Sequence, residues 1–257
     1  MAKGVHEALI HPTASLGEDV EIGYGAIIEK NVTIGNGTKI GAYSYIAENT
    51  IIGEDNQIYP YVVIGFAPQD VNYGDEPTRV RIGNRNIIRE FVTIHRATGA
   101  GNETIIGDDN FIMAYVHIAH NCRLGNGIVI ANASQLAGYV EVQDHAFISG
   151  LCPIHQFVRI GAYAMVAGGY RVPKDVPPYA LVAGEPLRVV DVNRVGLRRH
   201  NFAPREIDRL HKAFRLLFST KYNLQQAIAM VQKELQMDHH VEYLIKFILE
   251  SKRGVVR

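Results

Sequence analysis

Aliphatic side chains recur at every sixth position of the chain from Ile10 to Val172. Of the 28 positions in this register, 25 are isoleucine, leucine or valine, and the exceptions are Asp70, Glu76 and Ala100. A period of six matches neither the helical period of 3.6 nor the alternation of a single strand, so it predicts a structural repeat. Many of the aliphatics are followed directly by glycine. The pattern therefore predicts short strands joined by tight corners, each pointing one aliphatic side chain inward, which is a parallel β-helix.

With three strands per coil, residues 18 apart would stack on neighbouring coils at the strand spacing of about 4.8 Å. About nine coils would then form a prism on the order of 45 Å long. Two stretches interrupt the repeat without changing its phase, because 64 to 82 is 18 residues and 94 to 106 is 12 residues. We therefore expect a β-helix over residues 1–190, with loops at about 65–81 and 97–104 that leave its core unbroken.

The repeat ends at Val172, and prolines that disrupt strand ladders and helix interiors follow it. Residues 191–200 have a helical and basic pattern. Apolar residues then recur at three- and four-residue spacing behind good N-terminal capping residues. Three further helices are expected, at about 204–220, 223–235 and 238–253. Residues 191–257 are thus predicted to form a C-terminal helical domain, placed to cover the open end of the β-helix.

Charge and composition exclude several classes of protein. The 26 basic residues balance the 26 acidic ones, which argues against a nucleic-acid binder that relies on bulk charge. No run of about 18 apolar residues is present to give stable membrane insertion, and Met1–Thr13 lacks the apolar run of a signal peptide. The two cysteines, Cys122 and Cys152, are too few for a disulfide scaffold. A cytoplasmic protein is expected.

Histidines mark the place where the repeat changes character. Six of the 11 lie between residues 95 and 200, namely His95, His117, His120, His145, His155 and His200. A metal site is one interpretation, but no HExxH or paired CxxC motif supports it. Nucleophilic catalysis by Cys122 is a second, although a small buried cysteine is the commoner state. The long polar loop at 65–81 also favours function, because loops on rigid scaffolds often carry it.

General-base catalysis by one histidine is a third interpretation. An imidazole, with an ordinary pKa of about 6.5, can take a proton from a hydroxyl near neutral pH, and such a base contributes about 10²–10⁴ in rate. In an acyl transfer, a backbone N–H should meet the oxyanion. Gly138 follows His120 by 18 residues and would stack beside it. That coincidence favours the general base, while six purely structural histidines remain an open alternative.

Several motifs in this order resemble one family. They are QDVNYGDEPTR, TIHR, HIAHNC, LAGYV, HQF and DVPPY, set within the hexapeptide repeat and followed by the basic helix. Together they resemble the bacterial UDP-N-acetylglucosamine O-acyltransferases over essentially the whole chain. The resemblance implies a left-handed parallel β-helix and a homotrimer with active sites between neighbouring chains. It also implies transfer of an (R)-3-hydroxyacyl chain from acyl carrier protein to the 3-position of UDP-N-acetylglucosamine, the first step of lipid A biosynthesis, without a metal or other cofactor.

The resemblance also implies roles for particular residues. His120 matches the general base, and the amide of Gly138 matches the oxyanion donor. Further matches are expected to bind substrate, with Asn193 and Arg199 reaching the nucleotide and Gly168 limiting acyl length. The full substrate-binding set is Gln69, Asp70, His95, His117, His155, Gln156, Gly168, Asn193 and Arg199.

This chain also departs from the family pattern. Asn121 follows the catalytic histidine where many members have aspartate, and a neutral amide stabilises imidazolium less than a carboxylate does. Tyr139 stands where a histidine is common, and Pro186 stands where another histidine contacts the nucleotide in some members. His200 replaces an arginine next to Arg199. Two alternatives to the implied function stay open. One is the same chemistry on a UDP-sugar with a 3-amino group, and the other is a β-helix scaffold without catalytic activity.

Overall fold

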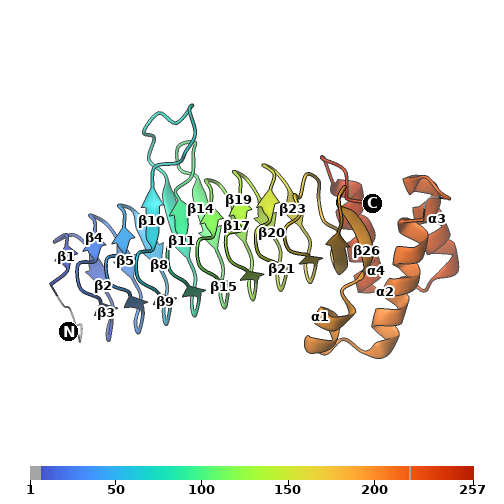
Figure 1. The fold of residues 1–257 in the computed structure, drawn as a ribbon, viewed down its shortest axis with the longest axis horizontal. Coiled ribbons are helices and arrows are strands. Elements are labelled where there is room, and N and C mark those ends of the chain that lie inside the picture. Colours follow the sequence, from blue (N-terminus) through green and yellow to red (C-terminus); the bar gives the residue numbers. More distant parts are fainter. Residues whose placement is uncertain (1–6, 220) are drawn as a thin grey trace.

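A computed structural model describes residues 7–219 and 221–257. The first part of Met1–Thr13, where no signal peptide is expected, and the expected helix end at Thr220 lie outside these residues. Within them, the chain forms a left-handed parallel β-helix followed by four α-helices, as predicted. Figure 1 shows a straight prism of coils with the helices gathered beyond its last coil.

Three sheets, parallel except for the last strand of the third, form the walls of the prism, and we number them by the order in which the chain enters them. Sheet 1 contains β1 (Leu9–Ile10), β4 (Ile27–Ile28), β7 (Tyr45–Ile46), β10 (Val63–Phe66), β13 (Thr93–His95), β16 (His117–Ile118), β19 (Gln135–Leu136) and β22 (Pro153–Ile154). Sheet 2 contains β2 (Ser15–Leu16), β5 (Thr33–Ile34), β8 (Thr50–Ile52), β11 (Arg79–Ile82), β14 (Glu103–Ile106), β17 (Arg123–Leu124), β20 (Glu141–Val142) and β23 (Arg159–Ile160).

Sheet 3 contains β3 (Glu21–Ile22), β6 (Lys39–Ile40), β9 (Gln57–Ile58), β12 (Ile87–Ile88), β15 (Phe111–Ile112), β18 (Val129–Ile130), β21 (Phe147–Ile148), β24 (Met165–Val166), β25 (Ala180–Ala183) and β26 (Arg188–Val192). Regular coils pair residues 18 apart, such as Ile10 with Ile28. The predicted loops do not change this register, since Ile64 pairs directly with Ile94. The aliphatics of the six-residue register point inward and form the buried core.

The corners explain the rest of the repeat. From Asp19 to Gly169, almost every residue three positions before a core aliphatic has a positive φ near 60°. This left-handed conformation is costly for most side chains and is adopted where a tight turn demands it. Glycine beside a core aliphatic has a different cause, because a Cβ on Gly41 would lie 2.4 Å from the backbone nitrogen of Pro60 on the next coil. Close stacking of coils therefore selects glycine there.

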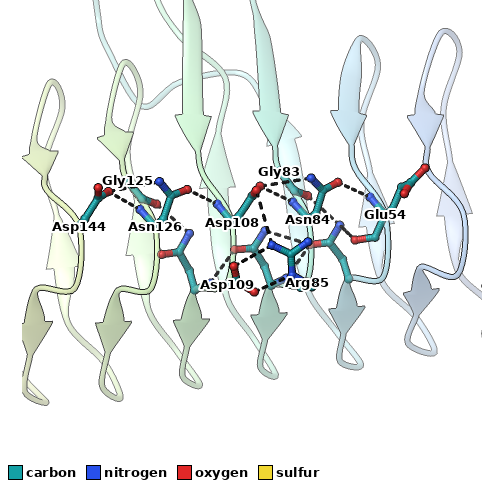
Figure 2. A network of polar contacts seen from close by, with 12 residues as sticks. Glu54, Gly83, Asn84, Arg85, Asp108, Asp109, Gly125, Asn126 and Asp144 are labelled. Atoms are coloured by element: carbon teal, nitrogen blue, oxygen red, sulfur yellow. Dashed lines mark hydrogen bonds and ion pairs between the residues drawn. The ribbon is translucent and has the colours of Figure 1, made fainter. Parts of the chain in front are cut away.

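A polar ladder connects successive coils along the corner between sheets 2 and 3 (Figure 2). The Asn84 side-chain oxygen accepts a hydrogen bond from the Glu54 N–H at 2.8 Å, and Asp108 Oδ1 accepts one from the Asn84 N–H at 2.8 Å. The ladder continues from the Asp108 N–H to Asn126 and from the Asn126 N–H to Asp144. Inside the same corner, three buried asparagines also bond to one another: Asn56, Asn86 and Asn110. These contacts satisfy backbone groups that the short strands leave unpaired.

The two loops are slightly shorter than predicted. Loop 1 spans residues 67–78 and loop 2 spans residues 96–102, because the residues flanking them remain paired in β10, β11, β13 and β14. Both loops leave the corner between sheets 1 and 2, and the longer excursion rises from β10 and β11 in Figure 1.

The helical region begins slightly later than residue 191, because β26 pairs with β25 in antiparallel fashion as far as Val192. Its helices are α1 (Arg194–Arg199), α2 (Pro204–Leu217), α3 (Leu224–Glu234) and α4 (His239–Glu250). Asn223 and Asp238 cap α3 and α4 as predicted. The C-terminal residues are bonded to the last coils, where Ser251 donates to Asp175 at 2.7 Å. None of the helices among the described residues has the length and apolar character needed to cross a membrane.

Candidate active site

Most of the predicted site residues meet at the corner between sheets 1 and 2. His120 lies there between β16 and β17, Gly138 between β19 and β20, and His155 and Gln156 between β22 and β23. Backbone hydrogen bonds stack the first two coils, since the Tyr139 N–H donates to the His120 carbonyl at 3.0 Å. The predicted stacking of His120 and Gly138 is therefore confirmed. Loops 1 and 2 leave the same corner and border these residues.

His120 is 7% exposed, and among the described residues its ring is hydrogen-bonded through Nδ1 alone. Its Nδ1 lies 2.9 Å from Asn121 Oδ1, and its Nε2 lies 3.9 Å from Asp70 Oδ2 in loop 1. The imidazole covers Gly138 so closely that a Cβ there would lie 2.5 Å from both Cε1 and Nε2. Within the described residues the Gly138 N–H donates to no acceptor. The Nε2 atom of His120, the Asp70 carboxylate and the backbone of Gly138 thus lie close together at one point of this corner.

Two further histidines flank this point on sheet 1. His95 is buried at the end of β13, and its ring meets that of His117 edge-on with centroids 4.9 Å apart. Burial lowers the pKa of His95 to about 4, and burial and the nearby His120 also lower the pKa of His117. Thr93 Oγ1 holds His117 Nδ1 at 2.7 Å, whereas His95 Nδ1 has no hydrogen-bond partner among the described residues. At neutral pH both rings are uncharged and can offer a donor or an acceptor to a ligand.

Loop 1 is held over the corner by contacts with loop 2. Glu76 accepts hydrogen bonds from the Gly99 N–H at 2.6 Å and from the Gly74 N–H at 2.8 Å. Arg96 packs against the Tyr73 ring and donates to its hydroxyl at 3.0 Å. The two loops therefore form one unit, which keeps Asp70 beside His120.

The other two chemical interpretations find little support in this geometry. Cys122 is fully buried, its Sγ lies 3.2 Å from the Ala137 carbonyl, and burial raises the pKa of its thiol to about 12. A thiol in that state is a poor nucleophile at neutral pH. In the part of the chain that the structure describes, no three His, Cys, Asp or Glu side chains are arranged to hold a metal ion.

Comparison with known proteins identifies the family. A family model for domain 2 of UDP-N-acetylglucosamine O-acyltransferase matches residues 175–256, and a bacterial hexapeptide transferase model matches residues 31–65 and 103–138. The acyl-[acyl-carrier-protein]–UDP-N-acetylglucosamine O-acyltransferase of Myxococcus xanthus is 45% identical and aligns over 100% of both chains. The chain belongs to the UDP-N-acetylglucosamine O-acyltransferase family.

Solved structures of this acyltransferase family agree. The enzyme from Bacteroides fragilis is 40% identical, with a TM-score of 0.95 over 97% of this chain and 98% of that chain. The enzyme from Campylobacter jejuni is also 40% identical, with a TM-score of 0.92 over 99% of both chains. The match extends through loops and helices, not only through the repeat.

Three of the residues that the family resemblance selects lie away from His120. Gly168 follows β24 at the corner between sheets 3 and 1. Asn193 caps α1 by accepting from the Gly196 N–H, and it donates to the Tyr163 carbonyl at the corner between sheets 2 and 3. Arg199 is exposed at the end of α1, which lies beyond the last coil and on the side of the prism opposite loop 1 in Figure 1. One chain alone does not bring these residues to the sheet 1–2 corner.

Sequence reasoning missed the residues that connect the loops to the site. In the sequence Glu76 is only an exception to the hexapeptide register, and Arg96 is only part of a motif. Thr98 carries no sequence signal, although it contacts Asn121 through both backbone and side chain. Such contacts join positions 23 residues apart and depend on the path of an irregular loop. Local sequence cannot predict that path.

We expect the Glu76 contacts to depend on pH. Backbone hydrogen bonds, first that from Gly99, lower the pKa of Glu76 below its ordinary value of 4.5. A lowered pKa means that the loop contact is fully present above pH 4.5 and is lost as the pH falls through the lowered value. Hydrogen exchange of peptides from loops 1 and 2, corrected for intrinsic rates, should be slow at pH 6 and several-fold faster in Glu76→Gln.

The wild-type and Glu76→Gln exchange rates should converge as the pH falls below 4.5. Peptides from the polar ladder around Asn126 serve as the control, since they do not contact Glu76 and should be unaffected. Equal protection of both loops in the two proteins at pH 6 would contradict the role given to Glu76.

Proposed function

We propose that the chain transfers an (R)-3-hydroxyacyl group from acyl carrier protein to the 3-hydroxyl of UDP-N-acetylglucosamine, the first step of lipid A biosynthesis. The observation that carries the proposal is the stacking of His120 over Gly138, with Asp70 placed 3.9 Å from Nε2. The Myxococcus xanthus relative, 45% identical over the whole chain, bears the name of an enzyme with these two substrates. No metal or organic cofactor enters the proposed reaction.

In the proposed mechanism His120 acts as the general base. Its Nε2 takes the proton of the sugar 3-hydroxyl while that oxygen attacks the thioester carbonyl carbon. The carbonyl oxygen becomes an oxyanion and accepts a hydrogen bond from the Gly138 N–H. The C–S bond then breaks, and the departing thiolate takes the proton back from the imidazolium. The products are the 3-O-acyl sugar nucleotide and the free thiol of the carrier.

Neighbouring groups would orient the sugar. Asp70 Oδ2 is too far from Nε2 for a direct hydrogen bond, so it is free to accept one from a sugar hydroxyl. Gln69 precedes it and is exposed. The neutral rings of His95 and His117 and the polar groups of His155 and Gln156 border the same corner, and we assign all of them to substrate binding.

A homotrimer is proposed because sheet 3 has an unpaired apolar face. In its N-terminal strands the outward side chains are exposed and polar: Glu21, Lys39 and Gln57. From β12 onward they are apolar and half-buried: Ile87, Phe111, Val129, Phe147, Met165 and Leu181. A continuous apolar face of this kind favours association. The number three is what the family resemblance implies.

Association would also complete the site. Asn193, Arg199 and Gly168 lie at other corners than His120, so a neighbouring chain would have to bring them to it. We propose that Asn193 and Arg199 then contact the nucleotide and that Gly168 borders the end of the acyl chain. A Cβ on Gly168 would lie 3.3 Å from the Gly150 carbonyl, so even a small side chain would reduce the space there.

A cytoplasmic location is proposed because both cysteines are free and buried.

A mass-spectrometric assay tests the proposal. Protein whose mass by light scattering is that of three chains would be given (R)-3-hydroxyacyl carrier proteins of several lengths and UDP-N-acetylglucosamine, without added metal. An alkali-labile monoacylated sugar nucleotide is the expected product, because an ester forms. No product with this sugar, but an alkali-stable product with a 3-amino analogue, would establish N-acylation instead. Absence of either product would favour a scaffold without catalytic activity.

A further inference from the structure

We propose that Thr98 in loop 2 is a positioning residue. It fixes the orientation of the Asn121 amide and thereby determines which ring nitrogen of His120 carries the proton. The proposal rests on the proposed function only in taking His120 as the general base. Thr98 is 8% exposed, and within the part of the chain that the structure describes its hydrogen bonds lead to His120 through Asn121 and Tyr139. Loop 2 would thus determine which ring nitrogen of the base is free to accept the substrate proton.

Thr98 and Asn121 form a closed pair of hydrogen bonds. Asn121 Oδ1 accepts from the Thr98 N–H at 2.9 Å, and Asn121 Nδ2 donates to the Thr98 carbonyl at 3.1 Å. A backbone N–H can only donate and a carbonyl can only accept, so these contacts permit one orientation of the amide. A flipped amide would face donor with donor and acceptor with acceptor. The Thr98 hydroxyl donates to the same Oδ1 at 3.1 Å and further stabilises this orientation of the amide.

The fixed amide determines the tautomer of His120. Its Oδ1 lies 2.9 Å from His120 Nδ1 and can only accept, so Nδ1 must carry the proton. A neutral imidazole holds one ring proton, which leaves the lone pair on Nε2. Nε2 is the nitrogen that lies beside Asp70 and against Gly138. The arrangement therefore presents the basic nitrogen to the point where the substrate hydroxyl would bind.

Tyr139 belongs to the same network. The Thr98 hydroxyl, having donated to Asn121, accepts from the Tyr139 hydroxyl at 3.1 Å. The Tyr139 ring in turn contacts the His120 ring edge-on, with centroids 5.3 Å apart. Asn121 and Tyr139 are two of the positions where this chain departs from the family pattern, and Thr98 contacts both. We infer that these two departures work as a pair through Thr98.

The network also explains why an amide suits position 121 in this chain. In Asn121→Asp an oxygen would replace Nδ2, 3.1 Å from the Thr98 carbonyl oxygen. Two acceptors at that distance repel each other, so the carboxylate would have to turn away from Thr98. A carboxylate is ordinarily the better partner for a catalytic histidine. Here we expect it to lower kcat instead of raising it.

Nitrogen NMR of the full-length protein tests the proposal directly. The ring nitrogens of ¹⁵N-labelled histidine would be detected at pH 8 through their couplings to the protons on the ring carbons. The His120 signals are those that are absent from the spectrum of His120→Gln. We expect the Nδ1–H tautomer in the wild type. Thr98→Gly removes the hydroxyl and frees the backbone, so it should mix the tautomers and lower kcat roughly tenfold, with KM for both substrates unchanged. Thr98→Ser keeps the hydroxyl and should restore most of the kcat.

Three results would overturn the proposal. These are an Nε2–H tautomer in the wild type, an unchanged tautomer and kcat in Thr98→Gly, and an Asn121→Asp enzyme as active as the wild type. Failure of the general-base assignment is distinguishable from these, because it would appear as full activity of His120→Ala. The tautomer in the wild type would still report on Thr98 in that case.

Discussion

Replacing His120 with alanine is expected to lower kcat by about 10² to 10⁴, the usual contribution of a general base. The imidazole is the only ring at this corner that has a carboxylate 3.9 Å from one nitrogen and a glycine directly beneath it, within the described residues. Alanine leaves Asn121, Gly138 and Asp70 in place but supplies no group to take the hydroxyl proton. KM for the sugar nucleotide should change little, because most groups that would bind the sugar remain.

Steady-state rates from the mass-spectrometric assay measure this effect. His11→Ala is the matched control, since His11 is exposed at the same type of corner and its ring, among the described residues, is hydrogen-bonded to Thr13 alone. It should keep wild-type kcat. A loss smaller than about tenfold in His120→Ala would show that another group, or water, takes the proton.

Adding a single methyl group at Gly138 is expected to reduce kcat by about 10² to 10³, the scale of losing one oxyanion donor. The new Cβ would lie 2.5 Å from Cε1 and Nε2 of His120, closer than van der Waals contact allows. The His120 ring would have to move, and the Gly138 N–H would then be poorly placed relative to it. Gly138 does not have a positive φ, so alanine itself fits the backbone conformation. The effect should therefore be local to the site.

Urea unfolding and kcat together test this second expectation. Gly150→Ala is the control, because Gly150 lies at the corner between sheets 3 and 1 and the nearest atom to its new Cβ would be the Asn132 carbonyl oxygen at 3.1 Å. Both variants should unfold near the wild-type urea concentration, which would show that the loss of kcat in Gly138→Ala is not a loss of stability. Near-normal activity of Gly138→Ala would mean that His120 need not lie against Gly138 during catalysis.

Much of the β-helix could be predicted because its information is local and repeated. One aliphatic every six residues, as at Ile22 and Ile40, identifies the inward positions, and the 18-residue stacking follows from three strands per coil. The helix starts at Asn223 and Asp238 could be predicted equally well, because a capping residue acts within one turn of the helix. The end of the strands at Val192 was harder to predict, since β26 is held by its antiparallel partner β25 and not by the repeat.

The register of the coils follows from the hexapeptide repeat alone, and it brings His120 and Gly138 together from positions 18 apart. It could do so because each coil must bury its aliphatics above those of the coil before. The paths of loops 1 and 2 are visible only in the folded chain, and so are the contacts that Glu76 makes between the loops and that Thr98 makes with Asn121. Loop paths are set by a few long-range hydrogen bonds whose partners follow no period. The pairing of aliphatics is repeated along the chain and leaves a pattern, whereas each loop contact occurs once and leaves none.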